Sequence, residues 1–256
     1  MTDGRHSVSL ISPLAAAGRA DEVVQRVSQA IQLGLFLDGE QLPPETEFAV
    51  QLGVSAMTLR EALATLREQG LVQTRRGRTG GTFVRRPATP PVDVLRARLR
   101  AITTSALRDL FDEQFAVSGA AAKLAAARAS GTSVRRLRTL VSQLSEASSL
   151  GSRIRADSRF HIEVAIAAQS ERLTRLEVGL QTQLAELLWL PPEIAAPPGG
   201  SDAAELLDPV LTAAEHAAIA EAIAAEDGDT ARALAERHVE RNLRQLTGLR
   251  LAMAQG

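Results

Sequence analysis

Three histidines and one aspartate in the C-terminal half of the chain are spaced so that they could bind one metal ion. Asp157 and His161 are four residues apart, which places both side chains on one face of a helix. His216 and His238 are 22 positions apart, with the turn-forming Asp227-Gly228-Asp229 between them. If this segment is a helical hairpin, each histidine lies about 11 residues, or roughly 16 Å, from the turn. The two histidines would then face each other at one level.

One carboxylate and three imidazoles form a ligand set that suits a divalent ion, zinc first, with nickel or manganese as alternatives. His216 shares its helical stripe with Ile219 and Ile223, so we expect it to point into the core. A single histidine is more often a core or surface residue than a ligand. Three of them together with an aspartate favour a metal site, and His6 near the N-terminus lies outside this set.

Two other functions could use the same residues. A metal ion with an open position could activate water, which would make the protein an enzyme. The sequence places no general base, second nucleophile or glycine-rich phosphate loop beside the four residues, so we expect no catalysis. The other alternative, in which the metal ion itself is the signal that the protein senses, stays open.

The elements that position these residues are expected to be helices, because alanine is abundant and aromatic residues make up only 3% of the chain. A chain of 256 residues with 45% hydrophobic residues can form two folded domains. The absence of cysteine excludes disulfides and thiolate metal sites. There is no long apolar run and no signal-peptide pattern, so we expect a cytoplasmic protein without a membrane partner.

The C-terminal part reads as helix throughout. The periodicity of apolar residues and the positions of Pro and Gly predict helices over 92–101, 105–129, 133–149, 153–168, 171–190, 206–226 and 229–252. The run Pro-Ala-Thr-Pro-Pro over residues 87–91 cannot continue a helix or a strand. We therefore expect a flexible arm over 1–18, a first domain over 19–86, a linker over 87–101 and a helical metal- and effector-binding domain over 102–254.

The first domain shows the pattern of a winged helix-turn-helix. Apolar residues recur at helical spacing from Ala20 to about residue 33, and Pro43-Pro44 opens a second helix that ends at Gly53. Ser55 is a good N-cap for a third helix that runs to about Gln69. Two short β-prone runs, 71–72 and 82–84, then predict a hairpin.

Positive charge gathers on this hairpin although the net charge of the chain is −1. Between Gln69 and Arg86 there are five arginines and no acidic residue: Arg75, Arg76, Arg78, Arg85 and Arg86. A solvated surface loop could carry the same charge. Next to a helix-turn-helix, however, a basic hairpin favours contacts with phosphates.

The helix after the tight turn enters the major groove in this architecture, and the wing lies along the backbone or minor groove. The candidates for DNA contact at the start of that helix are Ser55, Ala56, Met57, Thr58 and Arg60. Arg60 is the only strong donor among them and could pair with a guanine edge or a phosphate. In the wing the candidates are Arg75, Arg76 and Arg78.

Five short motifs of the N-terminal segment occur in a fixed order: LPPETEFA at 42–49, LGVS at 52–55, LREAL at 59–63, GLV at 70–72 and GGTFV at 80–84. Together they resemble the GntR family of bacterial repressors. The resemblance adds the wing glycines Gly80 and Gly81 to the DNA-binding candidates. Thr46 and Ala56 stand where that family usually has arginine, so the operator sequence implied by the family does not transfer to this chain.

The C-terminal part resembles the FCD-type ligand-binding domain of one GntR subfamily. The matching motifs are LAA at 124–126, DSRFH at 157–161 and EHAAIAEAI at 215–223, followed by Asp229, Ala233 and His238. The resemblance implies a six- or seven-helix bundle with a metal at the base of a central cavity, where a small carboxylate or another oxygen ligand completes the coordination. Asp157, His161, His216 and His238 match the metal positions.

The effector site departs from the family pattern. Gln114 and Ser118 stand where the family often has arginine and glutamate, and Ser170 stands where an asparagine is usual. Glutamine cannot pair with a carboxylate as arginine does, so the effector could be neutral or differently oriented. Arg241 and Asn242, one turn beyond His238, are further candidates for the cavity, although a surface or packing role is more ordinary for Arg241.

We therefore expect a mainly α protein that works as a DNA-binding transcription regulator, and as a repressor by resemblance. It would act as a homodimer on a two-fold symmetric double-stranded operator. Its small-molecule effector would be an organic or sugar acid bound at the metal. The sequence does not identify that acid, the metal or the operator.

Overall fold

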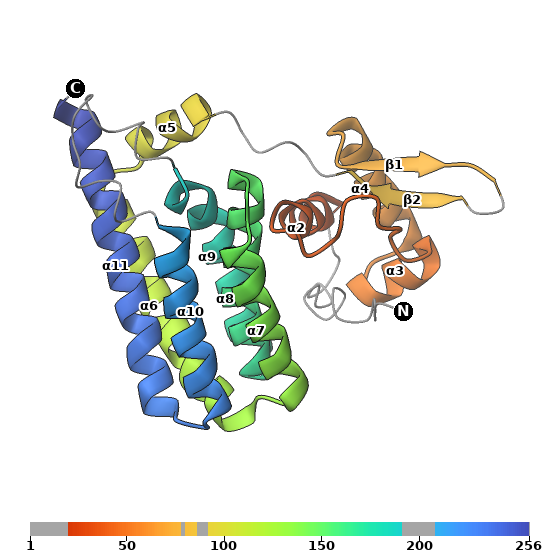
Figure 1. Cartoon of the computed structure of the whole chain (residues 1–256). Helices are drawn as coiled ribbons and strands as arrows, with labels where there is room; N and C mark the ends of the chain where they lie inside the picture. Colours follow the sequence, from red (N-terminus) through yellow and green to blue (C-terminus); the bar gives the residue numbers. More distant parts are fainter. Residues whose placement is uncertain (1–19, 78–79, 86–91, 191–207, 256) are drawn as a thin grey trace. The chain divides into compact units, whose positions relative to one another are not determined.

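A computed structural model describes residues 20–77, 80–85, 92–190 and 208–255. The chain forms two compact units, one within residues 1–88 and one within residues 89–256 (Figure 1). Among the helices that the model describes, none is long and apolar enough to cross a membrane. The expected arm over 1–18, Arg78, Arg86 and the proline-rich run over 87–91 lie outside the residues described.

The first unit consists of three helices and a two-stranded hairpin. The helices are α2 (Ala20–Gln32), α3 (Glu45–Leu52) and α4 (Ala56–Glu68), and the strands are β1 (Val72–Arg75) and β2 (Gly81–Val84). Val23, Val27 and Ile31 on one face of α2 are fully buried in a core that also contains Leu59 and Leu66 of α4. The unit is a winged helix-turn-helix, as predicted.

The turn between α3 and α4 has a local cause in the sequence. Gly53 ends α3 with a left-handed backbone (φ 67°), which a residue without a side chain adopts at little cost. Ser55 then caps α4 by accepting a hydrogen bond from the Thr58 N–H, so the next helix begins two residues later. The result is the short, fixed turn that sets α4 against α3.

The hairpin is longer than the apolar runs predicted. Strands β1 and β2 are antiparallel, with a register from Val72 opposite Val84 to Arg75 opposite Gly81. Backbone pairing thus extends beyond the predicted runs to Gln73, Thr74 and Arg75. Gly80 is required at the end of the hairpin, since an added Cβ would lie 2.6 Å from the Arg75 carbonyl oxygen.

The second unit is a helical bundle with seven helices among the residues described. They are α5 (Val92–Ala101), α6 (Thr104–Arg128), α7 (Gly131–Ser145), α8 (Leu150–Ala167), α9 (Glu171–Leu188), α10 (Pro209–Ala224) and α11 (Gly228–Gln255). The long helix α11 packs along α6, and α7 packs on both α8 and α10 (Figure 1). These results confirm the fold class expected from the sequence, a mainly α chain with a bundle of six to seven helices.

The side chains in the core of the bundle are large at one end and small at the other. At one end the core is made of large side chains such as Leu107, Phe111, Leu184 and Trp189. At the other end it is rich in alanine, including Ala121, Ala122 and Ala125 of α6. Small residues let helices approach closely, so the helices can pack tightly at this end of the bundle.

Residues 92–101 were expected to belong to a linker and to be helical. They form helix α5, which buries Leu95 and Leu99 in the same core cluster as α9 and α11. Arg98 of α5 also donates hydrogen bonds to Glu186 and to the Gln183 carbonyl oxygen of α9. This larger part of the expected linker therefore packs as part of the helical unit.

Candidate metal centre and DNA-binding surface

The structure brings Asp157, His161, His216 and His238 together in the interior of the helical unit. One ligand atom from each residue lies within 4.8 Å of the others, and all four side chains are buried. Asp157 and His161 come from α8, His216 from α10 and His238 from α11. Helices α10 and α11 form an antiparallel hairpin (Figure 1), and the rings of His216 and His238 are 4.8 Å apart, at one level, as the spacing predicted.

Asp157 lies between two of the histidines. Its Oδ1 is 3.5 Å from His216 Nε2 and 3.9 Å from His161 Nε2. The His161 and His238 rings are 5.0 Å apart. Phe160, the neighbour of His161, stacks on the His216 ring at 4.0 Å and fixes its plane.

Burial controls the charge of these groups. It holds the pKa values of His161 and His216 well below the usual range, and the nearby His238 lowers both further. The two imidazoles are therefore neutral at neutral pH, which is the form that binds metal. Burial raises the pKa of Asp157, because no solvent is available to stabilise its negative charge.

Hydrogen bonding within the cluster is incomplete in a way that fits a metal ion. In the described part of the chain, His161 Nε2 and both ring nitrogens of His216 are buried without a hydrogen-bond partner. Buried polar atoms are almost always paired, so orphaned nitrogens around one point indicate a missing partner. A buried carboxylate with three imidazoles is a donor set that zinc, nickel or manganese accepts. The residues present thus fit a divalent ion.

Both ring nitrogens of the fourth ligand candidate, His238, have partners. Its Nδ1 lies 2.7 Å from Glu215 Oε2, and its Nε2 lies 3.0 Å from the Asn242 amide nitrogen. Burial acts to raise the pKa of Glu215, but the hydrogen bond with His238 and the charge of Arg241 bring it below the usual value. Glu215 is therefore ionised. The sequence reasoning missed it, although a glutamate directly before His216 must also lie near the level of His238 in an antiparallel hairpin.

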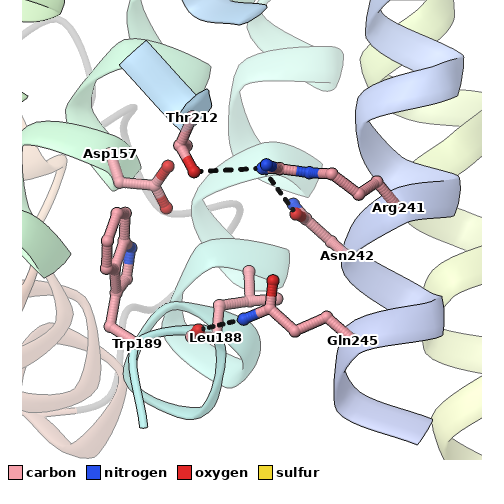
Figure 2. A pocket seen from close by; sticks show the side chains of 7 residues that line it. All are labelled: Asp157, Leu188, Trp189, Thr212, Arg241, Asn242 and Gln245. Atoms are coloured by element: carbon pink, nitrogen blue, oxygen red, sulfur yellow. Dashed lines mark hydrogen bonds between the residues drawn. The ribbon is translucent and has the colours of Figure 1, made fainter. Parts of the chain in front are cut away.

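A pocket adjoins the cluster on the side of Asp157 (Figure 2). Besides Asp157 it is lined by Leu188, Trp189, Thr212, Arg241, Asn242 and Gln245. Gln245 is held by a hydrogen bond of 2.8 Å from its amide to the Leu188 carbonyl oxygen. The expected cavity residues Arg241 and Asn242 lie here, while Thr212, Leu188, Trp189 and Gln245 were not predicted.

Arg241 is the cation of this pocket. It is only 9% exposed, so the surface role considered from the sequence is wrong. Its Nη2 contacts Thr212 Oγ1 at 3.1 Å and Glu215 Oε2 at 3.0 Å. Its Nε and Nη1 have no hydrogen-bond partner within the described residues. A guanidinium with two unpaired N–H groups beside a pocket can bind a planar oxyanion.

Gln114 does not line this pocket. It is fully buried on α6, and neither its amide oxygen nor its amide nitrogen has a partner in the part of the chain described. One turn further along α6, Ser118 donates a hydrogen bond of 3.0 Å to Glu177 of α9. Burial raises the pKa of Glu177, which also accepts a hydrogen bond from Gln181. This second polar group of the core contains no cation.

The first turn of α4 presents most of the expected DNA-contacting side chains. Met57 is 67% exposed and Ser55 is exposed, whereas Ala56 and Thr58 are partly covered. The Ser55 and Thr58 hydroxyls bond each other at 2.9 Å, and Ser55 also caps the helix. Both hydroxyls are therefore engaged within the protein.

Arg60, the strongest donor among these candidates, has a partner within the protein. Its Nε donates a hydrogen bond of 2.8 Å to Glu45 Oε2 on α3. Both side chains are substantially exposed. The pair joins the two helices of the helix-turn-helix across their turn and holds the guanidinium in one direction.

The wing arginines differ from one another. Arg75 lies on β1 with its guanidinium 4.3 Å from the centre of the Phe83 ring, while Arg76 is exposed at the end of the strand. Arg78 lies outside the described residues. Gly81 begins the returning strand, and its neighbour on the loop side is Gly80. Both glycines are partly covered, and the Gln41 side chain packs against Gly81 and donates a hydrogen bond to the Gly80 carbonyl oxygen.

Comparison with known proteins assigns both units. Residues 19–84 match the family of bacterial regulatory proteins called the gntR family, and residues 109–241 match the FCD domain. The second match covers just over half of the chain.

Two named relatives and one solved structure are similar to this chain. A protein of Mycobacterium gastri named as the HTH-type transcriptional regulator RmpR is 41% identical over 235 residues, which are 92% of this chain and 82% of that protein. An Escherichia coli protein named as an L-lactate dehydrogenase operon regulatory protein is 33% identical over 160 residues, 59% of each chain. Among solved structures, Escherichia coli McbR/YncC has a similar fold, with a TM-score of 0.51, 16% identity and coverage of 90% of this chain and 97% of that chain.

The two domain matches, the order of the two units and the relatives all lead to one assignment. The chain belongs to the GntR family, in the branch with an FCD domain, and is a DNA-binding transcription regulator.

Proposed function

We propose that the protein is a repressor whose affinity for its operator is controlled by a small organic acid bound at a metal ion. The observation that carries this proposal is the position of the buried cluster of Asp157, His161, His216 and His238 beside a pocket that contains Arg241. The cluster fits a divalent ion, and the unpaired N–H groups of Arg241 fit a carboxylate.

Each residue has a definite part in this proposal. Asp157 and the three histidines hold the ion, which supplies a fixed positive charge that an oxygen ligand can bind. Arg241 offers Nε and Nη1 to the carboxylate of the acid. Thr212 and Glu215 hold Arg241 from its other side, so its guanidinium is oriented before the acid arrives.

Arg241 also bears on whether the effector is an acid or a neutral molecule. Gln114 stands on α6 where the family often has a cation, so the sequence left open a neutral or differently oriented effector. Arg241 of α11 supplies a cation at a different place, so an acid is again the better choice. The carboxylate of the acid would then be bound by a cation of α11 rather than by one of α6.

On DNA, we propose that two copies of the chain bind a two-fold symmetric operator, each through the exposed start of α4 and the wing. Met57, Arg60, Arg75 and Arg76 are the contacts best supported by exposure or charge. Binding of the acid would favour one arrangement of the two DNA-binding units over another and so change operator affinity.

The test uses the purified full chain stripped of metal with a chelator. We expect it to take up one Zn²⁺, Ni²⁺ or Mn²⁺ per chain with a rise in Tm, and Asp157→Ala to abolish this uptake. We expect the loaded protein to bind L-lactate or gluconate, measured by calorimetry, and to bind neutral lactamide far more weakly. Arg241→Gln should remove this preference for the charged ligand.

DNA binding is then measured on the fragment upstream of the protein's own gene. Release of that fragment by an acid supports the proposal. If metal alone releases it and no acid changes the result, the ion itself is the signal. A wild-type protein that takes up no ion and shows no change in Tm would contradict the metal site.

A further inference from the structure

His238 differs from the other two histidines of the cluster, because both its ring nitrogens are already engaged. It is 1% exposed, with Nδ1 2.7 Å from Glu215 Oε2 and Nε2 3.0 Å from Asn242 Nδ2. His161 Nε2 and both nitrogens of His216 have no such partner within the described residues.

The partners of His238 determine its tautomer. The Glu215 carboxylate can only accept a hydrogen bond, so the ring nitrogen Nδ1 must carry the proton and donate it. The ring nitrogen Nε2 faces the Asn242 amide nitrogen, which can only donate, so the lone pair of the ring is on Nε2. Since Nδ1 faces Glu215, Nε2 is also the one nitrogen of His238 left to bind a metal ion.

The same lone pair accepts a hydrogen bond from the Asn242 amide. The orientation of this amide is set from the other end, because Arg241 Nη2 lies 3.4 Å from Asn242 Oδ1 and can only donate. The amide nitrogen must therefore face His238. A lone pair shared with this N–H group is not available to a metal ion at the same time.

We propose that Asn242 is a displaceable donor that occupies the Nε2 lone pair of His238 until a metal ion takes it, and that Glu215 is the positioning residue that keeps this lone pair on Nε2. The inference rests on the proposed metal site. It goes beyond that site, since it assigns a role in metal affinity to two residues outside the ligand set. Asn242 also lines the pocket, so the ion and the pocket share one amide.

The experiment measures Zn²⁺ affinity of the metal-stripped full chain by competition with a chromophoric chelator. Asn242→Ala and Asn242→Leu remove the competing hydrogen bond, and the second variant keeps the side-chain volume. We expect both to bind Zn²⁺ more tightly than wild type, by about fivefold, which corresponds to one ordinary hydrogen bond. Glu215→Gln should bind Zn²⁺ about 10- to 100-fold more weakly, because an amide no longer fixes the tautomer.

Matched controls separate these effects from general changes in charge or packing. Glu221→Gln makes the same substitution on the same helix at an exposed residue paired with Arg138. Glu240→Ala changes an exposed residue of α11 two positions from Asn242. Neither should alter Zn²⁺ affinity.

A measurement on the wild-type protein keeps the proposal testable if the variants do not fold. In ¹⁵N-histidine NMR spectra of the metal-stripped chain, His238 should show the Nδ1–H tautomer, and Zn²⁺ should shift Nε2 and the Asn242 side-chain amide together.

Unchanged or weaker Zn²⁺ binding by both Asn242 variants, or an Nε2–H tautomer, would overturn the proposal while leaving the metal site intact. If wild type binds no Zn²⁺, Ni²⁺ or Mn²⁺ at all, the proposed function fails first and this inference fails with it.

Discussion

Arg60 and Glu45 form an ion pair at the start of α4, the helix proposed to contact DNA. Arg60 is the strongest donor in the first turn of α4, and its Nε already bonds Glu45 on α3. An exposed pair of this kind adds little to folding stability. Its effect is to fix the direction of the guanidinium and to place a negative charge beside it, which opposes contacts with phosphates.

Replacing Glu45 with glutamine should therefore strengthen binding to DNA of any sequence. Arg60 would be free to neutralise a phosphate, so we expect the slope of log affinity against log salt to steepen by up to about one unit. Affinity for the operator should rise less than affinity for random DNA, because Arg60 loses its fixed direction. Fluorescence anisotropy over a range of salt concentrations measures both.

Glu47→Gln is the matched control. Glu47 is also exposed on α3, but it accepts a hydrogen bond from Gln51 rather than from an arginine. If both substitutions change DNA binding equally, only the loss of one negative charge matters and the Arg60 pair has no special role.

At the level of single residues, the sequence indicated more of the metal cluster than of the pocket. Helical periodicity relates Asp157 to His161, and the central turn relates His216 to His238, so local rules were enough to expect the cluster. Local rules could not decide whether Arg241 or Gln114 lines the pocket. Which of them meets the pocket depends on how α6 and α11 are rotated in the bundle, and packing of the whole core decides that.

At the level of elements, helix α5 shows most clearly that bounds can be predicted from the sequence while packing cannot. Residues 92–101 follow a proline-rich run and contain several arginines, which made a linker the natural expectation. The helix itself was predicted with the right bounds. Its packing was not, because Leu95 and Leu99 are only two apolar residues and find their partners on α9 and α11, far along the chain.

We expect Leu99→Ala to lower the free energy of unfolding of the helical unit by about 2–5 kcal/mol, as for other fully buried leucines. Val94→Ala on the same helix should have little effect, since Val94 is 56% exposed. Urea unfolding followed by circular dichroism measures both variants. Equal, small effects would mean that α5 behaves as a linker in solution.

The molecule as a whole has separate cores in its two units. The winged helix-turn-helix is built around Phe48, Leu59 and Leu66, and the clusters of the helical unit contain none of these residues. All candidate metal ligands and all residues lining the pocket belong to the second unit. The candidate metal ligands and the pocket therefore contain no residue of the first unit.

A chain shortened to residues 89–256 should fold and bind a divalent ion with the affinity of the full chain. The physical reason is that every ligand candidate and its partners, including Glu215 and Asn242, lie within this segment. Metal titration of the two chains side by side is the measurement. A loss of affinity of more than about tenfold would show that the first unit helps to form the site.

The hairpin of α10 and α11 has a consequence for how this protein can change in evolution. His216 and His238 lie in two helices that meet at residues 225–227. One residue inserted in either helix between a histidine and the turn would rotate that ring by about 100° around the helix axis and shift it by about 1.5 Å. A second insertion in the other arm would bring the two rings back to one level but would not reverse either rotation. A change in length is thus compatible with this cluster only in the turn, where it alters the spacing of the two histidines in the sequence and not the helix faces that carry them.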